Sequence, residues 1–147
     1  MEFEVGRGVI EALGLGLTLK RGDVAARANF CTLNNKGIVT DRRAGRIASE
    51  VCAALVDRIR SAVAKVGDVE VILKPGKGHR FVAVLRGPGL GGEVSDADPH
   101  KEGKVIPPAH ALVAGAANDK TAAVINAFVK QAGEVLAAEH PANAVVA

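Results

Sequence analysis

The chain has 147 residues, of which 48% are hydrophobic and 24% are charged, and its formal net charge is +3. This balance is typical of one soluble globular domain with a core of its own, and it argues against a disordered chain. No apolar run reaches the roughly 18 residues of a membrane span, and residues 1–4 are too acidic for a secretory leader, so we expect a cytoplasmic protein without a membrane partner.

Cysteine and aromatic content narrow the function classes further. Cys31 and Cys52 lack the spacing of a metal site, which favours two buried thiols. The aromatic content is 3%, with no Trp and no Tyr, which removes the stacking platforms of single-strand nucleic-acid binders. The small positive charge favours anionic ligands without specifying nucleic acid.

The first part of the chain predicts a lead-in and a β-hairpin. Residues 6–16 indicate a short helical turn between glycines, within a lead-in of residues 1–22 that packs on the edge of the fold. Residues 23–33 show the alternation of a half-buried strand. Asn and Gly in residues 34–37 favour a tight turn, after which residues 38–40 return as the partner strand.

The second part predicts a helix, another hairpin and a final helix. Ser49 is a suitable N-cap for a helix that Gly67 ends, because apolar residues recur between them at helical spacing. Short β-branched runs at residues 69–74 and 79–86 flank a Pro-Gly turn and indicate strands. Residues 119–140 carry a second apolar helical stripe.

The resulting order, ββα-ββα, predicts an α+β fold for residues 23–147. Its simplest form is a two-layer sandwich, an antiparallel sheet from two hairpins with both helices on one face. Residues 87–119 form a connection long enough to be functional or disordered. Its glycines, aspartates and histidine argue for a binding function, which these residues can have only if the loop folds over something.

Residues 41–46, DRRAGR, place three guanidinium groups and a carboxylate directly after a predicted strand. Guanidinium groups on a rigid sheet can hold a phosphate or carboxylate through paired hydrogen bonds, each worth about 1.5–3 kcal/mol when shielded from water. We interpret DRRAGR as part of an anion clamp in which Asp41 orients a guanidinium or accepts a substrate hydroxyl. The alternative is a solvated ion pair between Asp41 and an arginine.

Strand alternation places further polar groups on the face opposite the helices. Arg80 and Arg86 share one side of their strand, and Arg27 and Asn29 share one side of theirs, so these arginines should emerge on the open face or at its rim. His79 opens the strand that carries Arg80 and Arg86. It could belong to the anion clamp, and an exposed or capping histidine is an equally credible interpretation.

Other motifs carry weaker signals. Asp96, Asp98 and His100 resemble a metal set, but turn-forming aspartates beside a solvated histidine are the favoured interpretation. The segment KPGKGH lacks the spacing of a phosphate-binding P-loop, and GxGxxG does not occur. No serine has a general base beside it in the sequence, so we expect no catalytic nucleophile in this chain.

Four ordered motifs carry a family resemblance: GRGVIEALGLGLTLKRGDVAARANF, DRRAGRI, GHRFVAVLRGPGL and VSDADPHKEG. Together they resemble the middle section of the archaeal-type phosphoglycerate mutases that are independent of the cofactor 2,3-bisphosphoglycerate. The resemblance spans roughly residues 6–141. Those isomerases belong to the alkaline phosphatase superfamily and insert a substrate-binding domain into a metal-binding phosphatase-like domain, and this chain is similar to the insert.

The resemblance implies a division of labour. The phosphatase-like domain would hold two divalent metal ions (Mn, Mg or Zn) and a serine that takes the phosphoryl group, while the insert would hold the glycerate. The chain has no match to those metal ligands or to that serine, so the resemblance implies that it binds no metal or other cofactor and is inactive alone. Carried over by motif, the substrate-binding positions are Arg27, Asp41, Arg42, Arg43, Arg46, His79, Arg80, Asp98 and His100.

One position departs from the family pattern. Ala97 stands where the family loop has threonine, so contacts of that loop can differ here. The start at Met1 and the end at Ala147 are consistent with a domain cut from a longer protein, and a free-standing relative of the family is the alternative. The expected partners are therefore phosphoglycerate and the phosphatase-like domain of the parent protein.

Two rival functions come from other classes. A small basic α+β domain could bind nucleic acid, but the ββα-ββα order differs from that of RNA-recognition motifs and the RNP aromatics are missing. The 16 acidic residues also nearly balance the 19 basic ones, so we expect no nucleic-acid partner. The other rival is a purely structural or interaction domain.

Overall fold

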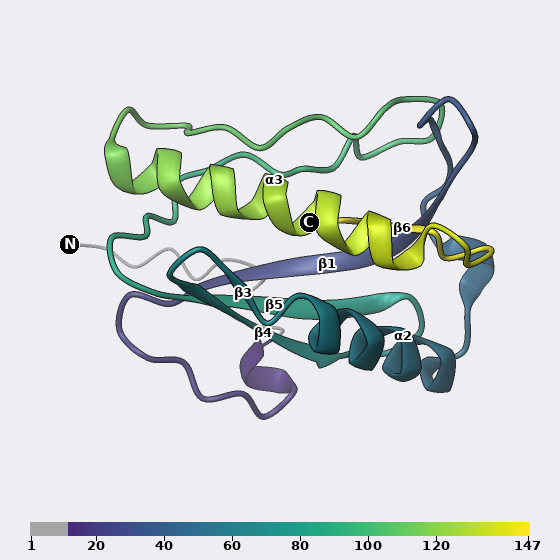
Figure 1. Ribbon diagram of the computed structural model, residues 1–147, viewed down its shortest axis with the longest axis horizontal. Helices are drawn as coiled ribbons and strands as arrows, with labels where there is room; N and C mark the ends of the chain where they lie inside the picture. Colours follow the sequence, from purple (N-terminus) through teal and green to yellow (C-terminus); the bar gives the residue numbers. More distant parts are fainter. Residues whose placement is uncertain (1–11) are drawn as a thin grey trace.

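The computed structural model describes residues 12–147, and the part of the predicted lead-in helix at residues 6–11 lies outside this range. Its centre is an antiparallel sheet in the order β2-β1-β5-β4-β3, with β6 also paired to β1 (Figure 1). The predicted α+β class with an antiparallel sheet is confirmed. The elements are β1 (Val24–Leu33), β2 (Val39–Asp41), η1 (Ala44–Arg46), α2 (Ser49–Ala62), β3 (Lys65–Val66), β4 (Val69–Pro75), β5 (Arg80–Arg86), α3 (Ala116–Leu136) and β6 (Ala144–Val146).

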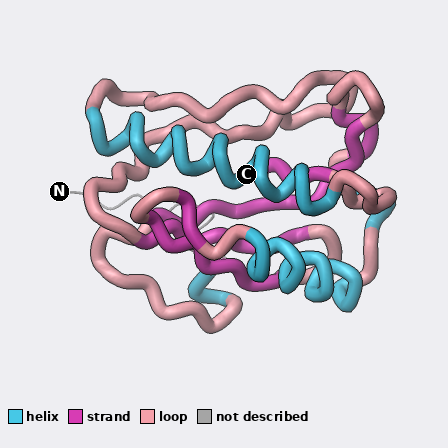
Figure 2. The backbone as a smooth tube through the Cα atoms, viewed as in Figure 1, coloured by secondary structure: helices cyan, strands magenta, loops and turns pink. Residues whose placement is uncertain are grey.

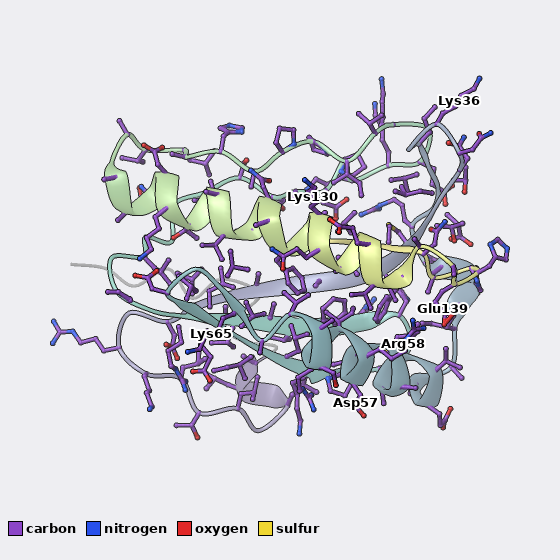
Figure 3. All side chains as sticks on the ribbon, viewed as in Figure 1. Lys36, Asp57, Arg58, Lys65, Lys130 and Glu139 are labelled. Carbon is purple, nitrogen blue, oxygen red and sulfur yellow. The ribbon has the colours of Figure 1, made fainter. Side chains whose placement is uncertain are left out.

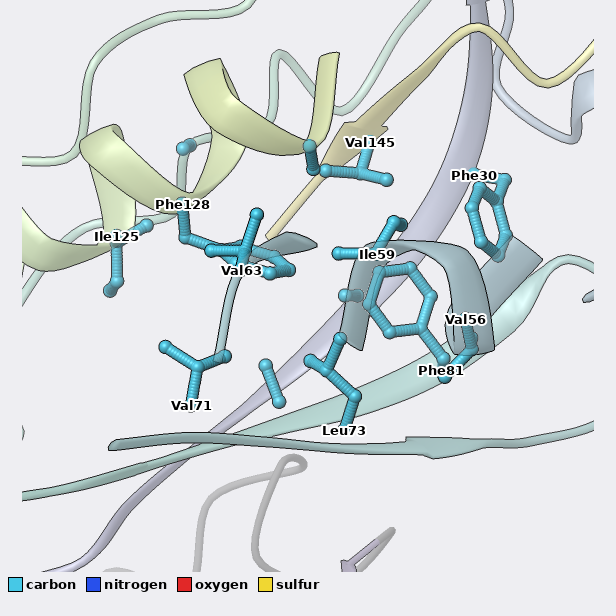
Figure 4. Packing of buried hydrophobic residues seen from close by; sticks show 14 of the residues in the cluster. Phe30, Val56, Ile59, Val63, Val71, Leu73, Phe81, Ile125, Phe128 and Val145 are labelled. Carbon is cyan, nitrogen blue, oxygen red and sulfur yellow. The ribbon is translucent and has the colours of Figure 1, made fainter. Parts of the chain in front are cut away.

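The main core lies between the two long helices and one face of the sheet. Phe30 of β1 and Phe81 of β5 have ring centroids 4.8 Å apart, and Phe128 of α3 lies 6.4 Å from Phe81. Figure 4 shows these rings among the aliphatic side chains of α2 and β4. Because residues of both helices and of this sheet face belong to one buried cluster, both helices cover the same face, as the alternation predicts.

The opposite face carries a smaller apolar cluster around Val82 and Val84 of β5. Leu15, Leu17 and Leu19 pack against it, after residues 12–14, which are helical. The lead-in therefore covers part of the open face, and the expectation that it packs on an edge is wrong for these residues. The reason is that β5 exposes valines on this side as well, and they need a cover.

Helix α2 ends earlier than predicted, at Ala62, and β3 follows where the sequence indicated a last helical turn. β3 pairs with β4 through a tight turn in which Gly67 has φ 61°. Gly67 therefore serves a hairpin instead of ending the helix, and both roles need the same left-handed backbone.

The predicted N-cap of α2 is also displaced. Ala48 occupies the cap position, without a side-chain cap hydrogen bond. The Ser49 hydroxyl instead accepts a hydrogen bond from the amide of Gly78, at 3.0 Å. Ser49 thus connects α2 to the turn that precedes β5.

Helix α3 begins and ends earlier than the predicted range of residues 119–140, and β6 is an element that the prediction lacked. Phe30 of β1 pairs with Val145 of β6, so β6 extends the sheet beside β1. An ion pair between Arg58 and Glu139 connects α2 to the segment after α3, and Figure 3 shows the two side chains meeting there.

The long connection, residues 87–115, is ordered against the rest of the domain. Figures 1 and 2 show it running beside α3 to the β1–β2 turn and back. Val94 forms a bridge with Ala111 across this connection, and Val105 forms one with Ile38 near the turn. Asn126 of α3 holds it through two hydrogen bonds to the backbone of Ala109, at 2.7 and 3.0 Å. The connection thus meets the condition for a binding loop, which is that it folds over another part of the chain.

No helix within residues 12–147 is long and apolar enough to cross a membrane.

Replacing the central ring tests the core. Phe81→Ala should lower the free energy of unfolding by about 3–5 kcal/mol, because Phe81 is fully buried and packs on two other rings. Chemical denaturation monitored by circular dichroism measures the change. Val51→Ala, at a 45% exposed position of α2, should change it by less than about 0.5 kcal/mol. Equal losses in the two variants would contradict this account of the core.

Candidate anion-binding site

The DRRAGR segment is a turn that the Asp41 carboxylate shapes. Its Oδ1 accepts a hydrogen bond from the amide of Arg43 and its Oδ2 accepts one from the amide of Gly45, both at 2.8 Å. These two bonds, in that order, are the main reasons why the pKa of Asp41 lies below its ordinary value. These oxygens bind backbone amides instead of the expected guanidinium group. Asp41 therefore positions the backbone that presents the arginines.

The turn itself has an unusual backbone. Ala44, Gly45 and Arg46 all have left-handed φ angles, of 48°, 68° and 57°. A Cβ on Gly45 would lie 2.8 Å from Cγ of Pro141, so glycine is required there by conformation and by space. Left-handed backbone at residues other than glycine is costly and is found disproportionately at binding sites. His100 is a further residue of this kind, with φ 58°.

Strands β1 and β5 bring the remaining sheet residues together. Asn29 is the cross-strand partner of Arg80, so their side chains lie on the same face, and Arg27 lies two residues from Asn29 on that face. His79 directly precedes β5, and its carbonyl accepts a hydrogen bond from the amide of Phe30, at 2.8 Å. The predicted sharing of the open face by Arg27 and Arg80 is confirmed.

His79 lies in the electric field of the other charged groups. Its pKa is lowered chiefly by burial, then by the positive charges of Arg80 and Arg43, with a smaller contribution from Arg27, while Asp41 opposes these effects. His79 therefore interacts electrostatically with groups from β1, from β2, from the turn that follows β2 and from β5. Charged groups of both hairpins therefore lie near this histidine.

The long connection contributes a carboxylate that holds Arg42. Asp98, whose side chain is 9% exposed, has its Oδ2 3.5 Å from Nη2 of Arg42. Asp98 Oδ1 also accepts a hydrogen bond from the amide of His100, at 2.8 Å, and Nε2 of His100 lies 3.0 Å from Asp96. The backbone amide of Arg42 donates to Glu102 at 3.1 Å. Acidic residues of the connection thus position one arginine of the DRRAGR turn.

The sequence DADPH does not form a metal centre in this structure. Asp98 closes a turn over the amide of His100, as the turn-forming interpretation predicts. Within residues 12–147 no cluster of three or more His, Cys, Asp or Glu side chains is suited to hold a metal ion. The ionic partners of Asp98 are Arg42 and His100, so a metal would have to displace them.

Two hollows divide most of the predicted residues between them, and Arg42 lines both. The first, of about 610 Å³, is lined by Thr40, Asp41, Arg42, Arg43, Arg46, Lys101 and Glu102. The second, of about 380 Å³, includes Arg27, Asn29, Arg42, Asp98 and His100 in its lining. His79 and Arg80 line neither hollow. Arg80 is connected to the second hollow by its cross-strand pairing with Asn29, and His79 interacts electrostatically with Arg27, Asp41 and Arg43.

Residues outside the predicted set also belong to this region. Lys101 and Glu102 line the first hollow and had no signal beyond their place after DPH. Asn29 lines the second, and its alternation with Arg27 in ARANF is the signal that could have singled it out. Arg86 lies on the same face as Arg80 but at the opposite end of β5. Its Nη2 lies 2.8 Å from Oδ2 of Asp23, with which it forms an ion pair.

Comparisons with known proteins decide the family. The model of the family described as 2,3-bisphosphoglycerate-independent phosphoglycerate mutase matches residues 1–143. This chain belongs to that family. The resemblance carried by the four ordered motifs is confirmed, and membership of this family gives the nucleic-acid alternative no support.

Relatives of this family show how much of a mutase the chain represents. It is 46% identical over 136 residues to a probable mutase of Thermotoga sp. (strain RQ2), covering 92% of this chain and 33% of the relative. It is 47% identical over 138 residues to a mutase of Methanothermobacter thermautotrophicus, covering 94% of this chain and 34% of the relative. The chain therefore spans about a third of the length of these curated relatives.

A solved structure of the family has the same fold. The cofactor-independent phosphoglycerate mutase from Thermoplasma acidophilum superposes with a TM-score of 0.83 at 34% sequence identity. The match covers 96% of this chain and 40% of that one.

The role of Asp41 can be tested by its pH dependence. Asp41→Ala should lower the free energy of unfolding by about 1–2 kcal/mol at neutral pH, because two amides of the turn lose their acceptor. The folded pKa of Asp41 is lowered, so its contribution is present above the unfolded pKa and is lost as the pH falls through the folded one. The difference between wild type and variant should therefore shrink from about pH 5 to about pH 2.

Urea denaturation over that pH range measures the effect of Asp41→Ala. Asp57→Ala is the matched control, because Asp57 is an exposed carboxylate of α2 whose ion pair with Arg60 lies within one helix. It should cost less than about 0.5 kcal/mol. Similar losses for both variants would show that Asp41 has no special role in the turn.

Proposed function

We propose that this chain is the substrate-binding part of a cofactor-independent phosphoglycerate mutase. The parent enzyme would interconvert 2-phosphoglycerate and 3-phosphoglycerate in cytoplasmic glycolysis and gluconeogenesis. In this proposal residues 23–147 form the insert domain and residues 1–22 its lead-in. The proposed substrate-binding residues are Arg27, Asp41, Arg42, Arg43, Arg46, His79, Arg80, Asp98 and His100.

The match of the mutase family over residues 1–143 carries the proposal, and the positive charges near His79 support it. Arg27, Arg43 and Arg80 come from three separate segments, and each of them lowers the pKa of this histidine. Like charges gathered in this way repel one another, so the arrangement costs free energy without an anion. A phosphorylated acid would remove that cost and would accept charge-assisted hydrogen bonds from the guanidinium groups.

Such a site suits phosphoryl transfer. Most of the catalysis in these reactions comes from positioning the substrate and neutralising its charge, so a domain that holds the anion supplies a large part of the work. Asp41 and Asp98 would hold the turn and Arg42 in place, while Arg43 and Arg80 would contact the oxyanions. The pKa of His79, lowered chiefly by burial and then by its cationic neighbours, would rise as the anion arrives, so that binding would favour proton uptake.

The remaining chemistry belongs elsewhere in the proposed parent enzyme. Two divalent metal ions would supply charge neutralisation and activate a serine in the phosphatase-like domain, which is the proposed partner of this chain. Residues 12–147 do not fit a metal-binding role, because the carboxylate of Asp98 already pairs with Arg42 and His100. We therefore assign this chain substrate binding alone.

Calorimetric titration with 3-phosphoglycerate tests the proposed function. Arg43→Gln and Arg80→Gln should each weaken binding about tenfold, because each removes a charge-assisted contact. Arg21→Gln, at an exposed position just before β1 and far from Asn29 along that strand, is the matched control and should leave the affinity unchanged. Preference for a short RNA at low salt, or equal affinities in all variants, would contradict the proposal.

Proton uptake by His79 gives a second test. NMR titration of the free chain should show a pKa of His79 below the ordinary histidine value, and saturating 3-phosphoglycerate should raise it because an anion offsets the nearby guanidinium groups. The affinity for 3-phosphoglycerate should therefore increase as the pH falls from the His79 pKa of the complex to that of the free chain. A His79 pKa unmoved by saturating ligand would place the anion elsewhere.

A further inference from the structure

Two buried side-chain atoms in the second hollow have no hydrogen-bond partner among the described residues. They are Oδ1 of Asn29, an acceptor, and Nε of Arg42, a donor. A buried polar group without a partner is destabilising, and native structures avoid it unless the group has another use. The two atoms have opposite hydrogen-bonding character and line the same cavity, so one ligand could satisfy both.

Both groups are held in place before any ligand arrives. Asn29 pairs with Arg80 of β5 on one side and with Val146 of β6 on the other, so the sheet sets the direction of its side chain. Arg42 is held at its guanidinium by Asp98, at 3.5 Å, and at its backbone amide by Glu102, at 3.1 Å. Rigid placement of this kind is what allows a site to discriminate between ligands, because little ordering is left for binding to accomplish.

The cavity suits a small hydroxy acid. Its volume of about 380 Å³ lies near the lower end of the range for small-ligand sites. A hydroxyl group can donate to the Asn29 oxygen, and a carboxylate on the adjacent carbon can accept from Nε of Arg42. An acid without the hydroxyl would leave the Asn29 oxygen buried and unpaired.

We propose that Asn29 is a specificity-determining residue that reads the hydroxyl group of a phosphorylated 2-hydroxy acid, while Arg42 Nε binds its carboxylate. This inference rests on the proposed function and adds to it the group that distinguishes the substrate from other small anions. A site built to hydrogen-bond a hydroxyl rejects the analogue that lacks it far more strongly than an apolar pocket would.

The test compares two ligands on the full chain. Calorimetry would measure the affinity of 3-phosphoglycerate and of 3-phosphooxypropionate, which has the same phosphate and carboxylate but no 2-hydroxyl. The wild type should prefer 3-phosphoglycerate about tenfold or more. Asn29→Leu should abolish this preference while retaining the affinity for 3-phosphooxypropionate, because only the acceptor is lost.

Two further variants separate the role of the oxygen from that of shape and charge. Asn29→Asp keeps an acceptor in the same shape, so it should keep the preference even though added negative charge lowers both affinities. Asn35→Leu makes the leucine replacement at an exposed turn position and should behave as the wild type. Circular dichroism checks the fold, and Asn29→Ala replaces Asn29→Leu if the larger side chain prevents folding.

Each outcome decides the inference. Equal affinity of the wild type for the two ligands, or a preference that survives Asn29→Leu, would overturn it while leaving the proposed function intact. Loss of the preference in Asn29→Asp would overturn the assignment of Asn29 as an acceptor. A wild type that binds neither ligand would overturn the proposed function and this inference with it.

Discussion

The antiparallel pairing of β1 with β5 is the interaction on which the rest of the structure depends. It aligns Ala28 with Phe81 on one side of the sheet and Asn29 with Arg80 on the other. Alternation along the same two strands thus sends aromatic side chains into the core and polar ones to the open face. A shift of one residue in this pairing would move the cationic groups into the core and the rings into solvent. Packing of the core and placement of the candidate site are therefore one constraint.

The candidate site gathers positive charge, and the carboxylates nearby support that arrangement. Asp41 binds two backbone amides of the turn, and Asp98 and Glu102 hold Arg42. The contacts of Asp41 and Glu102 fix the backbone that carries the arginines, and the contact with Asp98 holds the guanidinium group of Arg42. The left-handed backbone at Arg46 and His100 has an energetic cost that the hydrogen bonds of the same segments offset. The site is rigid because its acidic residues bind the scaffold.

Membership of the phosphoglycerate mutase family and the architecture of this chain agree with each other. The chain spans about a third of its curated relatives, and it shares its fold with a solved mutase over nearly its whole length. Residues 12–147 have a core of their own under α2 and α3, as a domain does.

Local patterns in the sequence are enough to predict the first hairpin, the helical stripes, the antiparallel α+β class and the concentration of arginines beside a strand end. These features depend on neighbouring residues: the Asn34–Gly37 turn closes with a hydrogen bond between residues three apart, and alternation on β1 is visible within ten residues. The family could also be inferred from the sequence, because four motifs occur in a fixed order.

Which distant groups meet depends on how the whole chain packs. The amide of Leu33 donates to the side chain of Asn143, 110 residues away, and no local pattern predicts this contact or the strand β6 that follows it. Gly67 could have ended a helix or made a hairpin, since both need a positive φ, and pairing of β3 with β4 selected the hairpin. The partner of Arg42 likewise depended on how the long connection folds over β2. Periodicity reports what one segment prefers, whereas a site requires several segments to meet.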